Sequence, residues 1–384
     1  MTDQSPGAAL ISAVQSGGDR RDLRLDACRG LALWFIFIDH IPNNALSWLT
    51  LRNLGFSDAS EIFVFVSGYT CMLAYGGALQ QEGWLTIVTR ALRRGWEIYA
   101  AFLLLLMFYL ALIWALSGGG SAYLDETNTA FFFRDPGAAI IHIAVLQYTP
   151  MNTDILATFV LLHLAFPVVL WLMNRSAMLT IAASFLLYLM VQLYSWYLPA
   201  WPSGEMYFNP LAWQLLFVFG AWYAHGSTER VRTILRSRAM LALAVLFLAF
   251  GLAVTLSWQV KALEGFLPEA ISKLIYPIYK SHLAPVRLVH FLSLALVVVR
   301  LTPRHWNGWP KPLVTALIRC GENSLAMYCF QVLLAFIGFV ILTRISSNLA
   351  VHVAVSFAGI GLMIAAANLL TWEAKLDRRG PKLF

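Results

Sequence analysis

Apolar residues come in long runs along most of this chain, and polar residues are confined to the short segments between the runs. Stretches of about 20 predominantly apolar residues recur, which is the length that an α-helix needs to cross the hydrocarbon core of a bilayer. Each such stretch is therefore predicted to be a membrane-spanning helix. They cover residues 30–49, 59–79, 96–117, 153–173, 178–198, 209–226, 239–259, 285–300, 323–343 and 349–372.

A shorter apolar run at 136–148 is below spanning length and predicts an interfacial or re-entrant helix. The composition agrees with a membrane protein, because 59% of the residues are hydrophobic and only 12% are charged, too few to cover a water-facing surface. The sequence thus predicts an all-α polytopic membrane protein of about ten helices, with a single transmembrane domain over residues 20–375. Residues 1–19 are expected to be a disordered cytoplasmic leader and residues 376–384 a cytoplasmic tail.

The basic residues predict the orientation of the chain. With ten crossings, most of the 27 Lys and Arg residues fall in segments on one side of the membrane, and the positive-inside rule makes that side cytoplasmic, together with both termini. The net charge of +7 is then mostly a consequence of topology. No long basic run or base-stacking motif is present, so the expected surroundings are a lipid bilayer and no nucleic acid.

An acid and an imidazole lie side by side in the first apolar run, at Asp39 and His40, with Pro42 close behind. Ionisable groups at bilayer depth cost about 2.5–3.5 kcal/mol each on insertion scales, which favours a functional site. Arg29 lies eleven residues before His40, close to three helical turns, so both are predicted on one helix face. Pro42 removes a backbone donor, and we expect this stretch to face a cavity. Structural alternatives are a buried histidine and an acid that accepts a hydrogen bond from a neighbouring helix.

The second apolar run begins with Asp58 and Glu61 in the spacing of a helix capping box, and capping is as good an explanation for these acids as a chemical role. Ser67 and Gly68 are small, which would let the first two predicted helices approach closely. Ser67 and Tyr69 could also donate hydrogen bonds to a carbonyl oxygen.

Arg90 and Arg93 are three residues apart, on one face at the start of the third predicted helix. They are either ordinary positive-inside residues or a pair that binds the phosphates of an anionic nucleotide.

These motifs, in this order, resemble the membrane-bound acyltransferase-3 superfamily. Within it, "GENSLAMYCFQVLL" at 321–334 and the first hundred residues are most similar to the OpgC family, whose members succinylate osmoregulated periplasmic glucans. Gln331 is a departure, because many acyltransferase-3 members have a histidine on this span. The residues that carry the resemblance are Arg29 with His40, Ser67-Gly68-Tyr69, and Arg90 with Arg93.

The resemblance implies an O-acyltransferase of the bacterial inner membrane, with succinyl-CoA as a cytoplasmic co-substrate and a periplasmic glucan as acceptor. It implies no permanently bound cofactor and no metal. Arg29, Arg90, Arg93 and Ser67 would bind the acyl-CoA. His40 would be the general base, with Asp39 or another acceptor fixing its tautomer, although Asp39 could instead bond a neighbouring helix, and a transient acyl-histidine is also compatible.

The carboxylate of a succinyl group would need a cation or several donors near mid-membrane. Arg287, three residues before His290, is the first candidate, and an interfacial arginine that reaches lipid phosphate is the alternative. The predicted acceptor or acyl pocket therefore comprises Asp58, Glu61, Tyr69 and Arg287.

Two other functions compete with acyl transfer. A proton-coupled small-molecule transporter would explain the Asp39–His40 pair alone, and a structural assembly factor would explain none of the motifs. The sequence does not specify the oligomeric state.

Overall fold

The computed structural model describes residues 22–118, 120–226, 229–263, 265, 267–303 and 306–379. The predicted leader and the last five residues lie outside these ranges. Within them the chain forms helices and loops with no β-strand, apart from one isolated bridge between Pro199 and Glu205. The all-α prediction is confirmed for this part of the chain.

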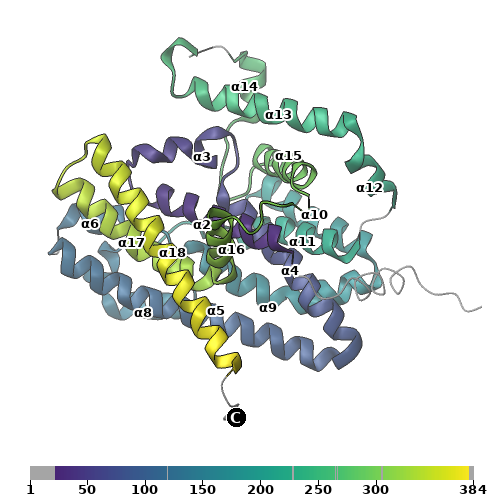
Figure 1. The fold of residues 1–384 in the computed structure, drawn as a ribbon, viewed down its shortest axis with the longest axis horizontal. Coiled ribbons are helices and arrows are strands. Elements are labelled where there is room, and N and C mark those ends of the chain that lie inside the picture. The colour runs from purple at the N-terminus through teal and green to yellow at the C-terminus, as the bar shows by residue number, and fades with distance from the viewer. Residues whose placement is uncertain are drawn as a thin grey trace, which may run out of the picture.

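In the described part of the chain, ten helices have 17 residues or more and form the body of the molecule (Figure 1). Seven of them are long and apolar enough to cross a membrane, and all seven coincide with predicted spans. The ten are α2 (Leu23–His40), α4 (Ala59–Glu82), α5 (Trp84–Ser117), α9 (Asp154–Arg175), α10 (Ala177–Tyr194), α11 (Pro210–Gly226), α13 (Arg238–Ser257), α15 (Pro285–Leu301), α17 (Ser324–Arg344) and α18 (Leu349–Arg379).

The other three predicted spans also form helices, but with weaker membrane character. Helices α11 and α15 have only 17 residues each. Helix α2 has 18 residues, and it carries several charged side chains over that length. The charged residues of α2 are Arg24, Asp26, Arg29 and Asp39.

The remaining elements are short helices in the connections. Helix α8 has nine residues, which confirms a short helix within the predicted 136–148 segment that cannot cross a membrane. The short elements are η1 (Ala45–Leu49), α3 (Leu51–Leu54), α6 (Ser121–Glu126), α7 (Ala130–Arg134), α8 (Pro136–Ala144), α12 (Glu229–Arg236), η2 (Lys261–Leu263), α14 (Glu269–Ile275) and α16 (Pro312–Glu322).

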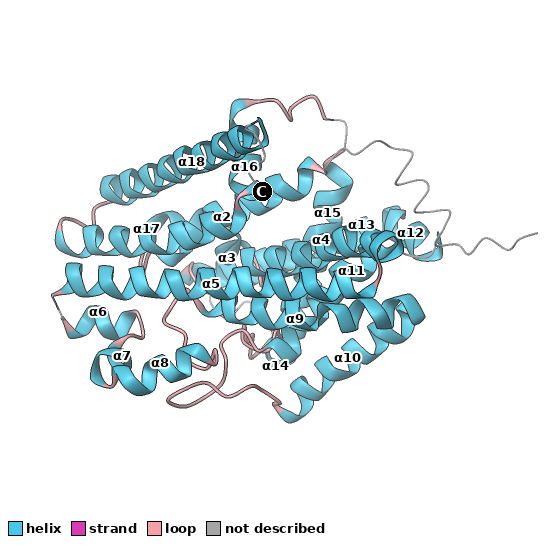
Figure 2. Ribbon diagram, turned by 90° about the horizontal axis from the view of Figure 1, so that it is seen from below, coloured by secondary structure: helices cyan, strands magenta, loops and turns pink. Residues whose placement is uncertain are grey.

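Helix α2 lies in the middle of the molecule and packs against α4, α16 and α17. Helix α17 in turn packs against both α5 and α18, and Figure 2 shows these long helices running side by side. The elements that carry the predicted site are therefore adjacent, although they are up to 300 residues apart in the sequence.

Glycines set the close contact between α2 and α16. A Cβ atom on Gly30 would lie 1.9 Å from the carbonyl oxygen of Leu317, and one on Gly321 would lie 1.9 Å from that of Asp26. Both distances are shorter than any real contact, so only glycine fits. The backbone of α16 thereby lies directly against the first half of α2.

Helix α4 meets α11 in the same way. A Cβ on Gly68 would lie 1.8 Å from the carbonyl oxygen of Phe217, and one on Gly220 would lie 2.0 Å from that of Phe65. The expectation that Gly68 brings the first two predicted helices together is wrong, because its close neighbour is α11. Small residues permit a close approach between helices, but the sequence does not show which neighbouring helix packs against them.

Candidate functional site

Helix α2 ends at His40, and the chain then turns away. Asn43 is in the left-handed region with φ 60°, and Pro42 has no amide to continue the helix. The Ile38 carbonyl accepts instead from the amide of Ile41 and from the side-chain amide of Asn44, each at 3.4 Å. The predicted helix 30–49, with His40 at its middle, is thus wrong in position. The apolar residues continue beyond Pro42, but the helix ends at His40.

Asp39 is bonded to the segment that follows this turn. Its Oδ1 accepts a hydrogen bond of 2.7 Å from the hydroxyl of Thr50, which is fully buried at the start of α3. Adjacent residues on a helix point about 100° apart, so the two side chains need not share a partner. The carboxylate of Asp39 therefore orients the loop after α2.

His40 faces α17. Its ring lies edge-on to the ring of Tyr328, with 6.3 Å between the centroids and 87° between the planes. The side chain of Gln331, one turn further along α17, also lies beside the His40 ring. Nδ1 of His40 is buried and has no hydrogen-bond partner among the described residues.

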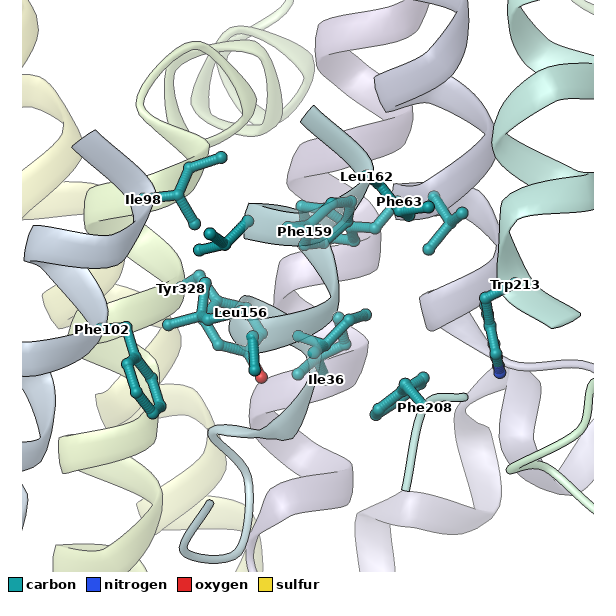
Figure 3. Close-up of a cluster of buried hydrophobic side chains, with 14 of the residues drawn as sticks. Ile36, Phe63, Ile98, Phe102, Leu156, Phe159, Leu162, Phe208, Trp213 and Tyr328 are labelled. Carbon is teal, nitrogen blue, oxygen red and sulfur yellow. The ribbon is translucent and has the colours of Figure 1, made fainter. Parts of the chain in front are cut away.

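A cavity of about 70 Å³ is lined by residues of α2, α4, α5, α9 and α17, including Tyr328. Figure 3 labels Tyr328, Leu156, Phe159 and Phe63, which all line this cavity. The cavity also has polar lining residues, to which five helices contribute. Its polar and titratable lining residues are Arg29, Ser67, Arg94, His163, Ser324 and Tyr328.

Arg29 is held in place at this cavity. Its guanidinium donates to the hydroxyl of Thr70 at 2.7 Å and lies 3.7 Å from the carboxylate of Asp26. The structure thus brings together Arg29 and Ser67 at one cavity, and Tyr328 in the same wall contacts His40.

Arg90 and Arg93 do not line this cavity. Arg90 pairs with Glu82 at 2.7 Å, and the Arg93 side chain is 81% exposed and pairs with Glu97 at 3.2 Å. Arg94 lines the cavity instead, and it also pairs with Glu97 at 3.0 Å. Arg93 and Arg94 are adjacent in α5, but one residue along a helix rotates a side chain by about 100°.

His163 is a lining residue that the sequence interpretation missed. It is buried in α9, and its Nδ1 lies 2.8 Å from the carbonyl oxygen of Phe159, so Nδ1 is the nitrogen that donates. In the neutral ring this leaves a lone pair on Nε2. A single histidine within the apolar run 153–173 was the available signal.

An ion cluster lies at the start of α4. Asp58 and Glu61 form the predicted capping box, since the Asp58 side chain accepts from the amide of Ser60 and Glu61 accepts from the amide of Asp58. The same two acids pair with the buried guanidinium of Arg287, at 3.1 Å and 2.7 Å. Lys280 lies 2.7 Å from Asp58. Burial opposes the charged form of Asp58, but Lys280 and Arg287 hold the pKa of its carboxyl well below the usual range.

His290 lies near this cluster, whereas Tyr69 is eight residues beyond Glu61 on α4. His290, one turn after Arg287 on α15, meets the hydroxyl of Ser57 at 2.7 Å through Nδ1. Tyr69 does not line the cavity, and its ring packs against that of Tyr223 on α11 with 6.1 Å between centroids. The charge on Arg287 is already balanced by two carboxylates, so its assignment to an acyl pocket stays a prediction.

The described residues contain no group of three or more His, Cys, Asp and Glu side chains that could hold a metal ion.

Comparison with known proteins identifies the family. The model of the family described as OpgC protein matches residues 21–375. This chain belongs to the OpgC family. The match runs from the residues just before α2 into α18, so every residue of the candidate site described above lies within it. OpgC membership makes the chain a membrane acyltransferase, and no match is found among curated proteins or solved structures.

Proposed function

We propose that this protein transfers a succinyl group from cytoplasmic succinyl-CoA to hydroxyl groups of osmoregulated periplasmic glucans. The observation that carries the proposal is the cavity with Arg29 and Arg94 in its wall, joined through Tyr328 to His40. An anionic donor would meet the arginines, and its reactive end would extend toward the imidazole. A cavity with arginines in its wall, one of whose lining residues contacts a histidine, suits such a transfer inside an OpgC-family membrane protein.

The proposed topology has ten crossings in the bacterial inner membrane with both termini cytoplasmic. The three shorter helices α2, α11 and α15 are then crossings too. At about 1.5 Å per residue, 17 residues extend about 25 Å, slightly less than the hydrocarbon core of about 30 Å. Such helices suit the interior of the protein, where neighbouring helices and not lipid surround their ends.

The reaction assigned to the site exchanges one acyl bond for another. The hydroxyl oxygen of the glucan attacks the thioester carbonyl carbon, an ester bond forms, and the carbon–sulfur bond breaks. His40 accepts the hydroxyl proton as this oxygen attacks, and the proton then passes to the sulfur of the departing CoA. Transfer through an acyl-histidine would use the same residue as the nucleophile.

The phosphates of CoA are assigned to Arg29 and Arg94, with Ser67 as a hydroxyl donor. A guanidinium binds phosphate oxygens through two parallel hydrogen bonds, and both arginines reach the cavity. The family motif suggests that Arg90 and Arg93 bind the acyl-CoA. From the surface of α5 they would attract the same anion electrostatically.

The succinyl carboxylate is assigned to the ion cluster at the start of α4. Lys280 is the better candidate cation, because it pairs with one carboxylate where Arg287 pairs with two. Lys280 also acts electrostatically on His40, which supports assigning it to the reacting end of the donor. The thioester and the carboxylate of one succinyl group could then be bound together.

A proton-coupled transporter is the competing function. It would need Asp39 and His40 to work as a relay, but Asp39 is hydrogen-bonded to Thr50. The two proposals are separated by mass spectrometry of cell-envelope glucans from cells with and without the protein. Succinyl esters that depend on the protein support the transferase. Unmodified glucans in both strains, with solute uptake by reconstituted vesicles, would support the transporter.

A further inference from the structure

Gln331 is a buried polar side chain for which the proposed reaction has so far no role. It has 0% exposure on α17, and neither atom of its amide has a hydrogen-bond partner among the residues that the structure describes. Buried amides nearly always have partners, because water no longer compensates for the missing hydrogen bonds. An amide without one, inside a packed helix bundle, calls for an explanation.

The neighbour of this amide is His40. Tyr328 and Gln331 are one turn apart, so both lie on the face of α17 that packs against α2. The Gln331 side chain lies beside the His40 ring, and Nδ1 of that ring is the other buried atom without a partner. Two groups that each lack a hydrogen bond thus lie together.

We propose that Gln331 is the positioning residue of His40: its Oε1 accepts the proton of Nδ1–H and keeps the lone pair on Nε2. This inference rests on the proposed function and adds the acceptor that a general-base histidine needs. Asp39, the acceptor suggested by adjacency in the sequence, is hydrogen-bonded to Thr50. Nδ1 is the buried nitrogen, so Nε2 is the one left to meet the glucan hydroxyl.

The orientation of the Gln331 amide determines which ring nitrogen of His40 carries the proton. If the NH₂ group of Gln331 faced Nδ1, the ring proton would lie on Nε2, and His40 could not accept a proton there. With Oε1 facing Nδ1, the neutral ring is a base at Nε2. Gln331 is uncharged, so it can fix the tautomer without adding a further charge near Asp58, Lys280 and Arg52, the other charged groups that act on His40.

Two substitutions separate the roles of the amide. Gln331→Leu has a similar size and no acceptor, and it is expected to lower kcat roughly 10- to 100-fold, as loss of an orienting partner does, while KM for succinyl-CoA stays unchanged. Gln331→Glu keeps an acceptor oxygen and should retain most of kcat. Because a carboxylate holds the ring proton more tightly, it should also shift the rising part of the pH–kcat profile to higher pH.

The tautomer can be read without any turnover. Solid-state ¹⁵N NMR of histidine-labelled protein, with the His40 signals assigned by their loss in His40→Gln, should show Nδ1 protonated in the wild type and in Gln331→Glu. Gln331→Leu should lose this signature. The control is Gln214→Leu on α11, a glutamine whose amide is bonded to Ser184 in both directions and which should leave the His40 signals unchanged.

Either of two results would overturn the assignment: Nδ1 unprotonated in the wild type, or Gln331→Leu with unchanged His40 signals. An active wild type whose kcat is unaffected by Gln331→Leu would also overturn it while leaving the transferase proposal intact. If the wild type did not turn over succinyl-CoA at all, the proposed function would fail, and the NMR spectra would still decide the contact between Gln331 and His40.

Discussion

Asp39 and His40 are neighbours in the sequence but belong to different surroundings in the structure. The Asp39 carboxylate accepts from Thr50 at 2.7 Å, beyond the end of α2, whereas the His40 ring lies edge-on to Tyr328 of α17. The first contact holds the loop that follows the helix. The second joins the imidazole to Tyr328, which lines the cavity together with Arg29 and Arg94. Asp39 thus stabilises the loop, and the adjacent His40 is the residue assigned to the chemistry.

Asp39→Asn should therefore be mild. The amide oxygen of asparagine can still accept from Thr50, so transfer should stay within a few-fold of the wild type. Asp39→Leu leaves the Thr50 hydroxyl without its carboxylate partner and should lower the free energy of unfolding by about 1–3 kcal/mol. Thermal unfolding and kcat, measured on both variants and on Thr50→Val, test this division. A kcat as low for Asp39→Asn as for a His40 variant would contradict it.

Arg29 and Arg94 are predicted to bind the donor. Replacing either one with Met removes a charge-assisted bond of about 1.5–3 kcal/mol, so KM for succinyl-CoA should rise roughly 10- to 100-fold with a smaller change in kcat. Arg93→Met is the matched comparison, because its side chain is one residue away and 81% exposed. An increase in KM confined to Arg90→Met and Arg93→Met would favour the sequence motif over the cavity.

Lys280 is predicted to distinguish charged from neutral acyl groups. Lys280→Met should reduce transfer from succinyl-CoA much more than transfer from butyryl-CoA, since only the succinyl group carries a carboxylate. Arg287 is the cation that the sequence suggests for the succinyl carboxylate, and Arg287→Met tests it with the same two acyl donors. That variant leaves Asp58 and Glu61 without their guanidinium, so we expect it to lose stability and activity with both donors. Equal losses with both donors in Lys280→Met would remove this lysine from the acyl pocket.

Gly68 is predicted to be essential for the contact between α4 and α11. Gly68→Ala adds a Cβ 1.8 Å from a backbone carbonyl oxygen, so the helices must separate, at a typical overpacking cost of about 1–3 kcal/mol. Gly77→Ala on the same helix has nothing within 4 Å and should be neutral or slightly stabilising. Melting temperatures in one detergent compare them directly. Equal melting temperatures would mean that α4 and α11 do not pack as described.

The helices could be predicted from the sequence because hydrophobic length alone defines a membrane span. All seven helices with full spanning character coincide with predicted runs. The boundaries of α2 could not be predicted in this way. The apolar run continues past Pro42, and the helix begins seven residues earlier, among charged residues that hydropathy treats as loop. Their partners, Thr70 for Arg29 and α16 for the helix backbone, come from distant parts of the chain.

The candidate site was predicted only in part, for a related reason. Arg29, His40 and Ser67 were found because each lies in a motif, and the Asp58–Glu61 capping box was found because its contacts are local. Other features depend on tertiary packing. Whether Arg93 or Arg94 faces the cavity depends on the rotation of α5, and the contacts of Arg287 with Asp58 and Glu61 join residues more than 220 positions apart.

The most direct test of the account is succinyl transfer by purified protein in proteoliposomes, with succinyl-CoA on one side and glucan on the other, for the wild type and for His40→Gln. The wild type should form succinyl-glucan and release CoA in equal amounts. His40→Gln should bind succinyl-CoA with unchanged affinity but transfer at least about 100-fold more slowly, the usual loss for a general base. No ester from the wild type, or near wild-type transfer by His40→Gln, would contradict the account.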